Sequence, residues 1–478
     1  MDPLNGPVVI LLESDSHDVA PVQEALLAIQ PQIQLLIVPD LQNFNLAISK
    51  QHQELGTEAQ IILAILSGDA KLSPEAIKEI LKMPRDFELL VTSFEHSPKL
   101  VKEWADSGVF NLLQKPYDTL LLQQHLRLAL KPTTAPRDFA THNFKTSTRI
   151  EMLKEISLEA ISEIGIVTRS DREVPLHRVT KFYGKAFEWN HRQSVYARTL
   201  THRPHPTRTH ERSVFMTFFG VGREQMLQIR SRFPKEELPL IWREPIVPNS
   251  STRLGFLILG DPSPPGSEIA GTIQRNFENT EVLSLSEIPG AKAPLPSSLR
   301  AVIYHRDLTS LIEKDPRFKD LAKMPISTST PSDEELRQNA KAAIDTLVLP
   351  LERVSFFKKL AIQFPELKPV EEIAIHSYRR IESLEVGQPI DVTEVSESGL
   401  TMKYERELPL GTIRRFVLWQ PAEAGLPFLT ARCYLSLPQP DGNALNYFVF
   451  FGMSDAEIKY VRVWMRDHYI MDKNKSSS

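Results

Sequence analysis

Residues 202–212 hold the densest group of side chains that could bind an anion or a metal. Three histidines at loose spacing could ligate a metal, but no acidic residues stand in order beside them. An anionic partner, such as a phosphate or an acidic protein surface, fits the charge better, and a solvent-exposed hairpin tip is the favoured interpretation. The side chains concerned are His202, Arg203, His205, Arg208, His210 and Arg212.

No other arrangement in the sequence indicates catalysis. We find no pair of carboxylates, no Ser/His/Asp set and no phosphate-binding loop at the spacing these chemistries require. Cys433 is the single cysteine, so an internal disulfide and a cysteine-ligated metal are both excluded. The sequence therefore predicts a protein that is not an enzyme, with no metal and no resident cofactor.

Composition narrows the class of partner. The 478 residues carry a net charge of −4, from 56 Lys+Arg and 60 Asp+Glu, so we expect no nucleic-acid partner. The longest apolar runs, such as Val8–Leu12, are far below the roughly 20 residues of a membrane-spanning helix. No secretory signal is visible. We expect a cytoplasmic protein of about three domains or more, without membrane insertion.

The chain contains an internal repeat. Residues 161–177 align without a gap on residues 395–411, and seven positions are identical. Further on, Arg230 matches Arg462, with a register shift of two residues that one hairpin loop would explain. The identical pairs are Ser162/Ser396, Glu163/Glu397, Gly165/Gly399, Arg172/Arg406, Glu173/Glu407, Pro175/Pro409 and Leu176/Leu410.

Each repeated segment follows a stretch in which short apolar runs alternate with helical patterns. Such alternation is typical of βα units on a parallel sheet. The first stretch predicts strands at Val8–Leu12, Leu35–Val38, Ile61–Leu66, Glu88–Thr92 and Phe110–Leu113. The second predicts strands at Gly255–Leu259, Glu281–Leu283, Ala301–Tyr304, Pro325–Ser327 and Thr346–Leu349.

The repeated segments themselves are rich in strands and end in helices. Ser454 and Glu457 have the spacing of a capping box that opens the last helix. The predicted order is α/β domain, β domain, α/β domain, β domain, over residues 1–133, 143–248, 254–365 and 372–473.

The first α/β domain resembles the receiver domain of bacterial response regulators. The resemblance rests on Glu13 after the first strand, Thr92 ending the fourth, and Lys115-Pro116 after the fifth. It implies a flavodoxin-like fold with a five-stranded parallel sheet. Receivers hold Mg²⁺ with two acids and phosphorylate an aspartate, but here Ser14 replaces one acid and Ala64 falls at the acceptor position. A shifted register would offer Asp69 instead.

The second α/β domain departs further from the receiver pattern. Gly260-Asp261 replaces the acid pair, Tyr304 or His305 stands at the acceptor position, and Leu349-Pro350 replaces Lys-Pro. Thr328 keeps a hydroxyl near the fourth strand. The resemblance implies two pseudo-receivers without phosphotransfer.

The two β domains resemble PilZ domains, small β-barrels with a C-terminal helix that in many bacteria bind cyclic di-GMP. The family signature has two arginines, then an Asp or Asn before a Ser-x-x-Gly turn. Guanidinium groups pair with phosphate or a guanine edge, and a carboxylate accepts from guanine N–H groups. The first copy offers Lys145, Arg149, Ser162 and Gly165, without the carboxylate; the second offers Arg379, Arg380, Glu394, Ser396 and Gly399.

These resemblances imply a bacterial signal-transduction scaffold that acts through protein partners. Pairing through the receiver-like domains, within the chain or between chains, is a further expectation. The alternative is a cyclic di-GMP effector that controls motility or surface behaviour, with the ligand held by one or both PilZ-like domains. A third hypothesis is a regulator phosphorylated at Asp69.

Overall fold

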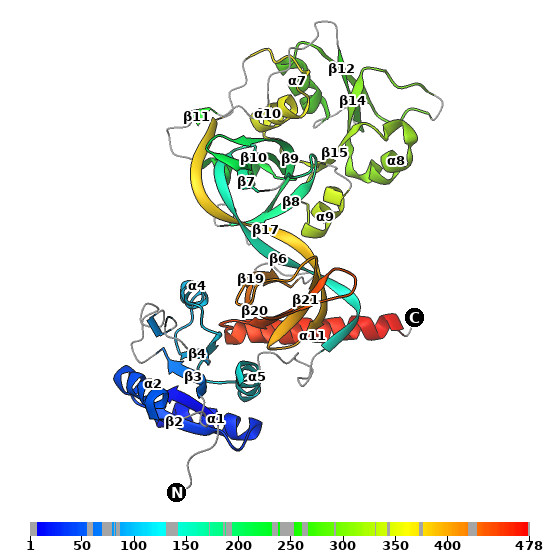
Figure 1. Ribbon diagram of the computed structural model, residues 1–478. Coiled ribbons are helices and arrows are strands. Elements are labelled where there is room, and N and C mark those ends of the chain that lie inside the picture. The colour runs from blue at the N-terminus through cyan, green and yellow to red at the C-terminus, as the bar shows by residue number, and fades with distance from the viewer. Residues whose placement is uncertain are drawn as a thin grey trace. The chain divides into compact units, whose positions relative to one another are not determined.

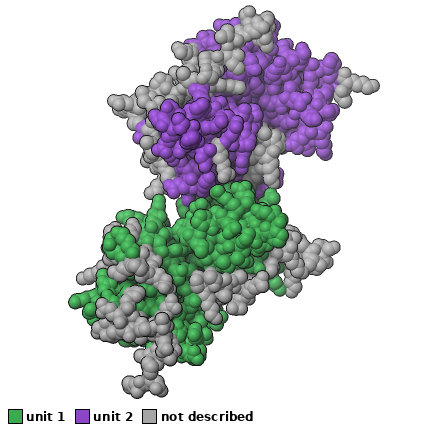
Figure 2. Space-filling model, viewed as in Figure 1, with its two compact units in different colours: residues 1–153, 388–478 green, residues 154–387 purple. Residues whose placement is uncertain are grey.

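The computed structural model describes residues 7–476 with the exception of 16 segments. These are 55–60, 69–78, 81, 83–86, 131–141, 172, 185–186, 188–193, 232–237, 240–252, 261–265, 291–292, 330, 342–344, 372–375 and 419–427. The described chain forms two compact units (Figure 2). Unit 1 comprises residues 1–153 and 388–478, and unit 2 comprises residues 154–387.

Each unit contains a five-stranded parallel sheet with helices on its faces (Figure 1). In unit 1 the strand order is β2-β1-β3-β4-β5. This is the order of the flavodoxin-like doubly wound fold, so the predicted fold class of the first α/β domain is confirmed. The strands are β1 (Val8–Leu12), β2 (Gln34–Val38), β3 (Ile61–Ser67), β4 (Glu88–Ser93) and β5 (Asn111–Gln114).

Near-continuous apolar runs explain why strands β1, β3 and β4 of this sheet are buried on both faces. Alternate residues of β1 point to opposite sides, so Val9 and Leu11 pack in one core and Ile10 and Leu12 in another. Helices α1 and α5 contribute to the first core, and α2 and α4 to the second. Their bounds are α1 (Ser16–Ile29), α2 (Leu41–Glu54), α4 (Pro98–Ser107) and α5 (Thr119–Leu130).

Unit 2 repeats the parallel sheet in the equivalent order β13-β12-β14-β15-β16. Its strands are β12 (Leu254–Leu259), β13 (Thr280–Leu285), β14 (Leu299–His305), β15 (Ala322–Ser327) and β16 (Leu347–Val348). Its helices are α7 (Gly266–Asn276), α8 (Thr309–Lys314), α9 (Asp333–Lys341) and α10 (Arg353–Gln363), with short 3₁₀ turns η3 (Arg306–Leu308) and η4 (Pro316–Phe318). Lys115-Pro116 and Leu349-Pro350 are both cis, at the same place in the two folds.

The antiparallel strands do not follow the consecutive domain boundaries that the sequence suggested. Two long strands, β6 (His142–Ser162) and β17 (His376–Val395), each begin in one unit and end in the other. In unit 1 the last part of β17 pairs with β18, and residues 151–153 of β6 pair with β19. In unit 2 the last part of β6 pairs with β7, and residues 385–387 of β17 pair with β8.

Each unit is therefore assembled from both repeats. The antiparallel sheet of unit 1 runs β17-β18-β21-β20-β19-β6, and that of unit 2 runs β6-β7-β10-β9-β8-β17-β11. The remaining strands are β7 (Gly165–Ser170), β8 (Val179–Tyr183), β9 (Ser194–His205), β10 (Arg208–Phe219), β11 (Leu238–Pro239), β18 (Gly399–Tyr404), β19 (Ile413–Val417), β20 (Leu429–Pro438) and β21 (Ala444–Phe450).

A helix follows each antiparallel sheet, as the sequence predicts. These helices are α6 (Arg223–Ser231) in unit 2 and α11 (Asp455–Ser476) in unit 1. The predicted capping box is confirmed, because Ser454 N donates to Glu457 Oε2 at 2.7 Å and Glu457 N donates to Ser454 Oγ at 3.3 Å. Among the described residues, no helix is both long and apolar enough to cross a bilayer.

Candidate functional site

The receiver-like site of unit 1 is a buried ion-pair cluster around Lys115. Glu13 follows β1 and Lys115 follows β5, so both lie at the carboxyl edge of the sheet. Lys115 Nζ lies 2.6 Å from Glu13 Oε2, 2.8 Å from Asp18 Oδ2 and 3.1 Å from Ser67 Oγ. The Lys115 side chain is only 1% exposed, and its ammonium is balanced by the two carboxylates.

The acceptor position of this cluster holds Ser67, which corrects the predicted Ala64. Ala64 lies in the middle of β3, where it pairs with Ile10 and Leu89. Ser67 ends β3 and pairs with Thr92. The sequence register was three residues short because the apolar run of β3 continues to Leu66, the residue before Ser67. Asp69, the other candidate acceptor, lies outside the described residues.

Thr92 is fully buried at the end of β4, as the receiver pattern requires. Burial raises the pKa of the neighbouring Tyr117 phenol to about 12, and Thr92 opposes that effect. Glu13 Oε1 accepts from the backbone N–H groups of Ser14 and Asp15 at 2.9 and 3.1 Å. The described site therefore brings together an acid, a hydroxyl and a lysine, with Ser67 at the end of β3.

At the equivalent edge of unit 2, the described residues do not form such a cluster. Leu259 pairs with Tyr304 as Leu12 pairs with Leu66, so Gly260 and His305 follow in the places of Glu13 and Ser67. This register settles the predicted choice between Tyr304 and His305 in favour of His305.

The fourth and fifth strands of unit 2 also differ from those of unit 1. His305 pairs with Ile326, which occupies the place of Thr92, so Thr328 lies two residues beyond the predicted hydroxyl position. Leu349 N donates to Ser327 O as Lys115 N donates to Ser93 O, so an apolar residue replaces the lysine. His305 is half-exposed and pairs with Asp307 at 3.0 Å. Asp261 lies outside the described residues.

The two Ser-x-x-Gly turns have a clear structural role. Ser162 Oγ accepts from Ile164 N and Gly165 N at 3.2 and 3.1 Å. In the second turn, Ser396 Oγ accepts from Gly399 N at 3.1 Å. Both serines are buried.

Both glycines of these turns are required by close backbone contact. A Cβ at Gly165 would lie 2.0 Å from Met216 O, and one at Gly399 would lie 2.0 Å from Phe448 O. A side chain at either position would displace the neighbouring strand. The pattern is thus explained by the fold without a ligand.

Receiver-like helices pack over the face on which these turns lie. In unit 1, Leu128 of α5 lines a narrow crevice with Glu394, Ser396 and Thr401. Thr401 Oγ1 donates to Glu394 Oε2 at 3.4 Å. In unit 2 the equivalent residue of α10, Ile362, packs against Ala160, Ile164, Val167 and Phe215.

The basic residues of the predicted nucleotide sites are distributed differently from the sequence expectation. Arg149 belongs to unit 1, together with Ser396 and Gly399 of the other repeat, and pairs with Asp391 at 3.1 Å. Lys145 lies on β6, and Arg379 and Arg380 lie on β17 in unit 2, but their side chains are outside the described residues. Arg149 therefore belongs to the same unit as the turn of the other repeat, and not to the unit that holds the turn of its own repeat.

An arginine from the helix after each antiparallel sheet joins that sheet to the receiver-like domain. In unit 1, Arg462 Nη2 lies 2.9 Å from Asp118 Oδ2 and 2.7 Å from Glu397 Oε2. These two hydrogen-bonded carboxylates raise the pKa of Arg462 above its ordinary value. Asp118 precedes α5, so the contact ties α5 to α11.

The same contact recurs in unit 2. Arg230 Nη2 lies 2.5 Å from Glu163 Oε2 and 3.6 Å from Glu352 Oε2, and Lys358 Nζ lies 2.6 Å from Glu163 Oε1. Burial opposes ionisation of Glu163, but Lys358 and Arg230 outweigh it and lower the pKa of this carboxyl. The sequence alignment paired Arg230 with Arg462 and Glu163 with Glu397, yet gave them no role.

A buried polar residue near the fifth strand makes a second recurring contact; it begins β5 in unit 1 and lies two residues before β16 in unit 2. Asn111 Oδ1 accepts from Gly452 N at 3.3 Å, and Asp345 Oδ1 accepts from Gly220 N at 3.4 Å. Sequence reasoning missed both residues. Their equivalence could have been found from the sequence, because Asn111 and Asp345 are 234 residues apart, as Gly165 and Gly399 are.

The cationic residues 202–212 lie on the arms of a hairpin, which corrects the loop expected before Ser213. Strand β9 extends to His205 and β10 begins at Arg208. His202 Nε2 lies 3.1 Å from Glu173, and His205 Nε2 lies 2.8 Å from Glu159. Within the described residues, no group of three potential metal ligands gathers here or elsewhere.

Comparisons with known proteins give short structural matches. No protein-family model matches the sequence, and no curated protein matches it. A response regulator from Thermotoga maritima is 16% identical and matches 26% of this chain and 98% of its own, with a TM-score of 0.23. An orphan response regulator of H. pylori is 16% identical and matches 27% of this chain and 99% of its own, with a TM-score of 0.23. A signal receiver domain from Clostridium thermocellum is 19% identical and matches 27% of this chain and 98% of its own, with a TM-score of 0.23. The fold assignment rests on the strand order of the sheets themselves.

Proposed function

We propose that this chain is a tandem duplication that serves as a non-enzymatic bacterial signalling scaffold, working through protein partners. Its α/β domains are pseudo-receivers that no longer transfer phosphate, and its antiparallel parts are PilZ-like. The observation that carries the proposal is the closed cluster of Lys115, Glu13 and Asp18 beside Ser67. A serine hydroxyl does not form the acyl phosphate on which receiver signalling depends.

The second receiver-like domain supports the same function. Gly260, His305 and Leu349 replace the acid, the acceptor and the lysine, while the sheet order is retained. A domain that keeps its fold without its phosphotransfer residues can still bind other protein surfaces, which is the function proposed here. Both receiver-like domains already pack against an antiparallel sheet of the same unit through their last helix, α5 or α10. This packing is a domain–domain contact within the chain.

Intact-mass measurement after incubation with acetyl phosphate and Mg²⁺ tests the proposal. We expect no mass increase on the wild-type chain. The matched control is Ser14→Asp with Ser67→Asp, which restores the second acid and the acceptor and should gain one phosphoryl group. A phosphoryl group on the wild-type chain, at Asp69 or elsewhere, would contradict the proposal.

The alternative function is a cyclic di-GMP effector. It is favoured by one feature, the presence of Arg149, Glu394, Ser396 and Gly399 in the same unit. Helix α5 covers the crevice beside these residues, so binding there would require Leu128 to move away. Calorimetric titration with cyclic di-GMP distinguishes the two proposals: saturable heat that Arg149→Ala abolishes would establish the effector, and absence of heat leaves the scaffold.

A further inference from the structure

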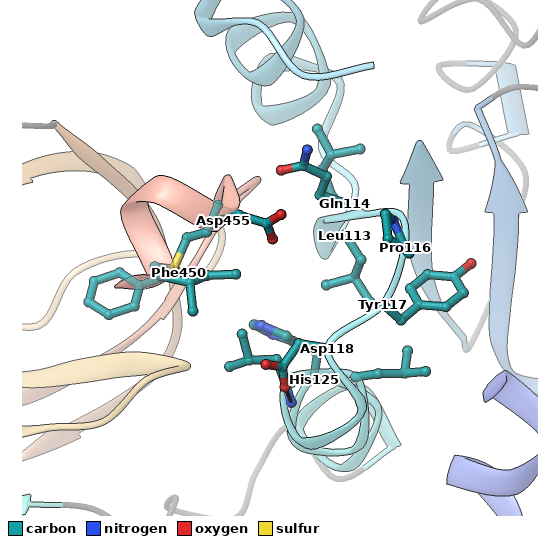
Figure 3. A pocket seen from close by; sticks show the side chains of 13 residues that line it. Leu113, Gln114, Pro116, Tyr117, Asp118, His125, Phe450 and Asp455 are labelled. Atoms are coloured by element: carbon teal, nitrogen blue, oxygen red, sulfur yellow. Dashed lines mark hydrogen bonds between the residues drawn. The ribbon is translucent and has the colours of Figure 1, made fainter. Parts of the chain in front are cut away.

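Each unit contains a cleft between its receiver-like domain and the helix that follows its antiparallel sheet. The cleft of unit 1 is shown in Figure 3, where the Gln114 and Asp455 side chains face each other across its mouth. With their open mouths, the clefts of units 1 and 2 measure about 450 and 480 Å³. Neither Lys115 nor the serines and glycines of the two turns line these clefts, although Ile164 of the first turn lines the cleft of unit 2.

The two clefts are built from equivalent residues. Receiver-like lining residues such as Leu112 and Thr346 are 234 positions apart, and those from the other side, such as Phe218 and Phe450, are 232 apart. These are the two separations that relate the repeats in the sequence. Twelve of the thirteen lining residues of each cleft correspond in this way, so the clefts are one feature present twice.

Apolar residues form most of the wall in both clefts, and the charge at the mouth differs between them. Asp455, the first residue of α11, corresponds to Arg223, the first residue of α6, and both are exposed. Deeper in the cleft, the buried His125 of unit 1 corresponds to Lys359. Burial lowers the pKa of His125 to about 4, so this imidazole is neutral.

The charged groups around the clefts give them opposite signs. The lining of the cleft in unit 2 holds two cations, Arg223 and Lys359, and one carboxylate, Glu352. The lining of the cleft in unit 1 holds two carboxylates, Asp118 and Asp455, together with the neutral His125. Lys359 pairs with Asp345 at 2.5 Å, so Arg223 supplies the excess positive charge in unit 2.

The cleft of unit 2 also contains a buried hydroxyl group. Ser355 lines it and is 5% exposed, and among the described residues its Oγ has no hydrogen-bond partner. A buried polar atom without a partner is costly and calls for an explanation. Leu121 stands at the equivalent position of unit 1, so the hydroxyl is specific to the cationic cleft.

From these observations we infer that the cleft of unit 2 binds a small apolar carboxylic acid in its ionised form. The apolar part lies against Phe218, Met226 and Leu347, the carboxylate is held by Arg223, and Ser355 donates to it. The cleft of unit 1 rejects the same ligand, because Asp455 repels the carboxylate and Leu121 offers no donor. This inference is independent of the scaffold function.

Titration of the full chain with hexanoate, followed by ligand-observed NMR, tests the inference. Hexylamine carries the same tail with the opposite charge and serves as the matched ligand. We expect saturable hexanoate binding at a single site and no saturable binding of hexylamine in unit 2. Arg223→Asp, which installs the unit 1 residue, should weaken hexanoate binding at least tenfold.

Two further variants keep the test decisive. Ser355→Leu, again the unit 1 residue, should also weaken binding at least tenfold, with the thermal unfolding midpoint recorded to show that the chain is folded. Asp455→Arg places the same charge at the cleft of unit 1 and should leave the hexanoate affinity at its wild-type value. The inference is overturned if wild-type binding does not saturate, or if Arg223→Asp and Ser355→Leu both bind like the wild type.

Discussion

Units 1 and 2 have the same framework but different polar side chains at equivalent positions. The difference is clearest at the residues that accept from Gly452 N in unit 1 and from Gly220 N in unit 2. In unit 1, Asn111 Nδ2 donates to His125 Nδ1 at 3.0 Å, so the pair is neutral. In unit 2, Asp345 and Lys359 form an ion pair at the same two positions. Both positions differ between the units, and the backbone N–H group of the nearby glycine has a side-chain acceptor in each case.

We interpret features that occur in both units as those that the fold requires. The cis prolines, the turn glycines and the arginine joined to two carboxylates occur in both units. Among the described residues, the Lys115 cluster occurs in unit 1 alone, and the charged residues that line the clefts differ between the units. The two units share their framework contacts and differ in the groups that could act on a ligand.

The largest single effect is expected at Lys115. Lys115→Leu installs the residue of unit 2 and leaves Glu13 and Asp18 buried without their cation, which we expect to cost about 4 kcal/mol. Urea unfolding of the full chain measures the loss. Adding Glu13→Gln should restore part of it, because one buried charge is removed. A single variant as stable as the wild type would show that the cluster is not needed.

The two turn glycines should respond alike. Gly165→Ala and Gly399→Ala each place a Cβ against a carbonyl oxygen, and we expect about 3 kcal/mol of destabilisation from either. Gly290→Ala is the control, since no atom lies within 4 Å of its added Cβ. Thermal unfolding compares the three. A large effect in only one turn would break the equivalence of the units.

Acid should destabilise unit 1 through His125 in a way that unit 2 lacks. The folded pKa of about 4 lies below the ordinary 6.5, so between these values the unfolded chain binds a proton that the folded chain does not. Stability due to this group therefore falls as the pH drops from 6.5 towards 4, by about 1 kcal/mol per pH unit. The difference between wild type and His125→Gln in urea unfolding at several pH values measures it. A pH-independent difference would contradict this assignment.

The smallest effect distinguishes the two arginine contacts. Both arginines are roughly 40% exposed, so we expect their loss to cost about 1 kcal/mol. Arg462→Met should cost more than Arg230→Met, because Glu163 keeps Lys358 whereas Gln124 stands at that position in unit 1. Lys358→Gln combined with Arg230→Met should remove the difference, and an unchanged ranking would count against this explanation.

Much of the parallel sheets could be predicted from the sequence. Runs such as Val8–Leu12 are apolar because both faces of the sheet are covered, and this signal is local. The repeat also located Arg230 and Arg462, and Glu163 and Glu397, before any contact was known. Ser67 was missed because its strand stays apolar up to the residue before it.

The exchange of strands between repeats could not be predicted. β6 and β17 have 21 and 20 residues, and nothing in their side-chain pattern says which neighbour each half pairs with. Backbone hydrogen bonds join strands regardless of side chain, so the choice of partner is set by non-local packing. For the same reason, consecutive domains were expected where the structure has units built from both repeats.

Expression of residues 154–387 alone tests this arrangement most directly. The segment contains all of unit 2, including its parts of β6 and β17. We predict a monomer that unfolds in one cooperative transition. The first sequence repeat, residues 1–249, lacks the partner of α5 and should not form a cooperative monomer. A cooperative, monomeric 1–249 fragment beside an unfolded 154–387 fragment would contradict the account.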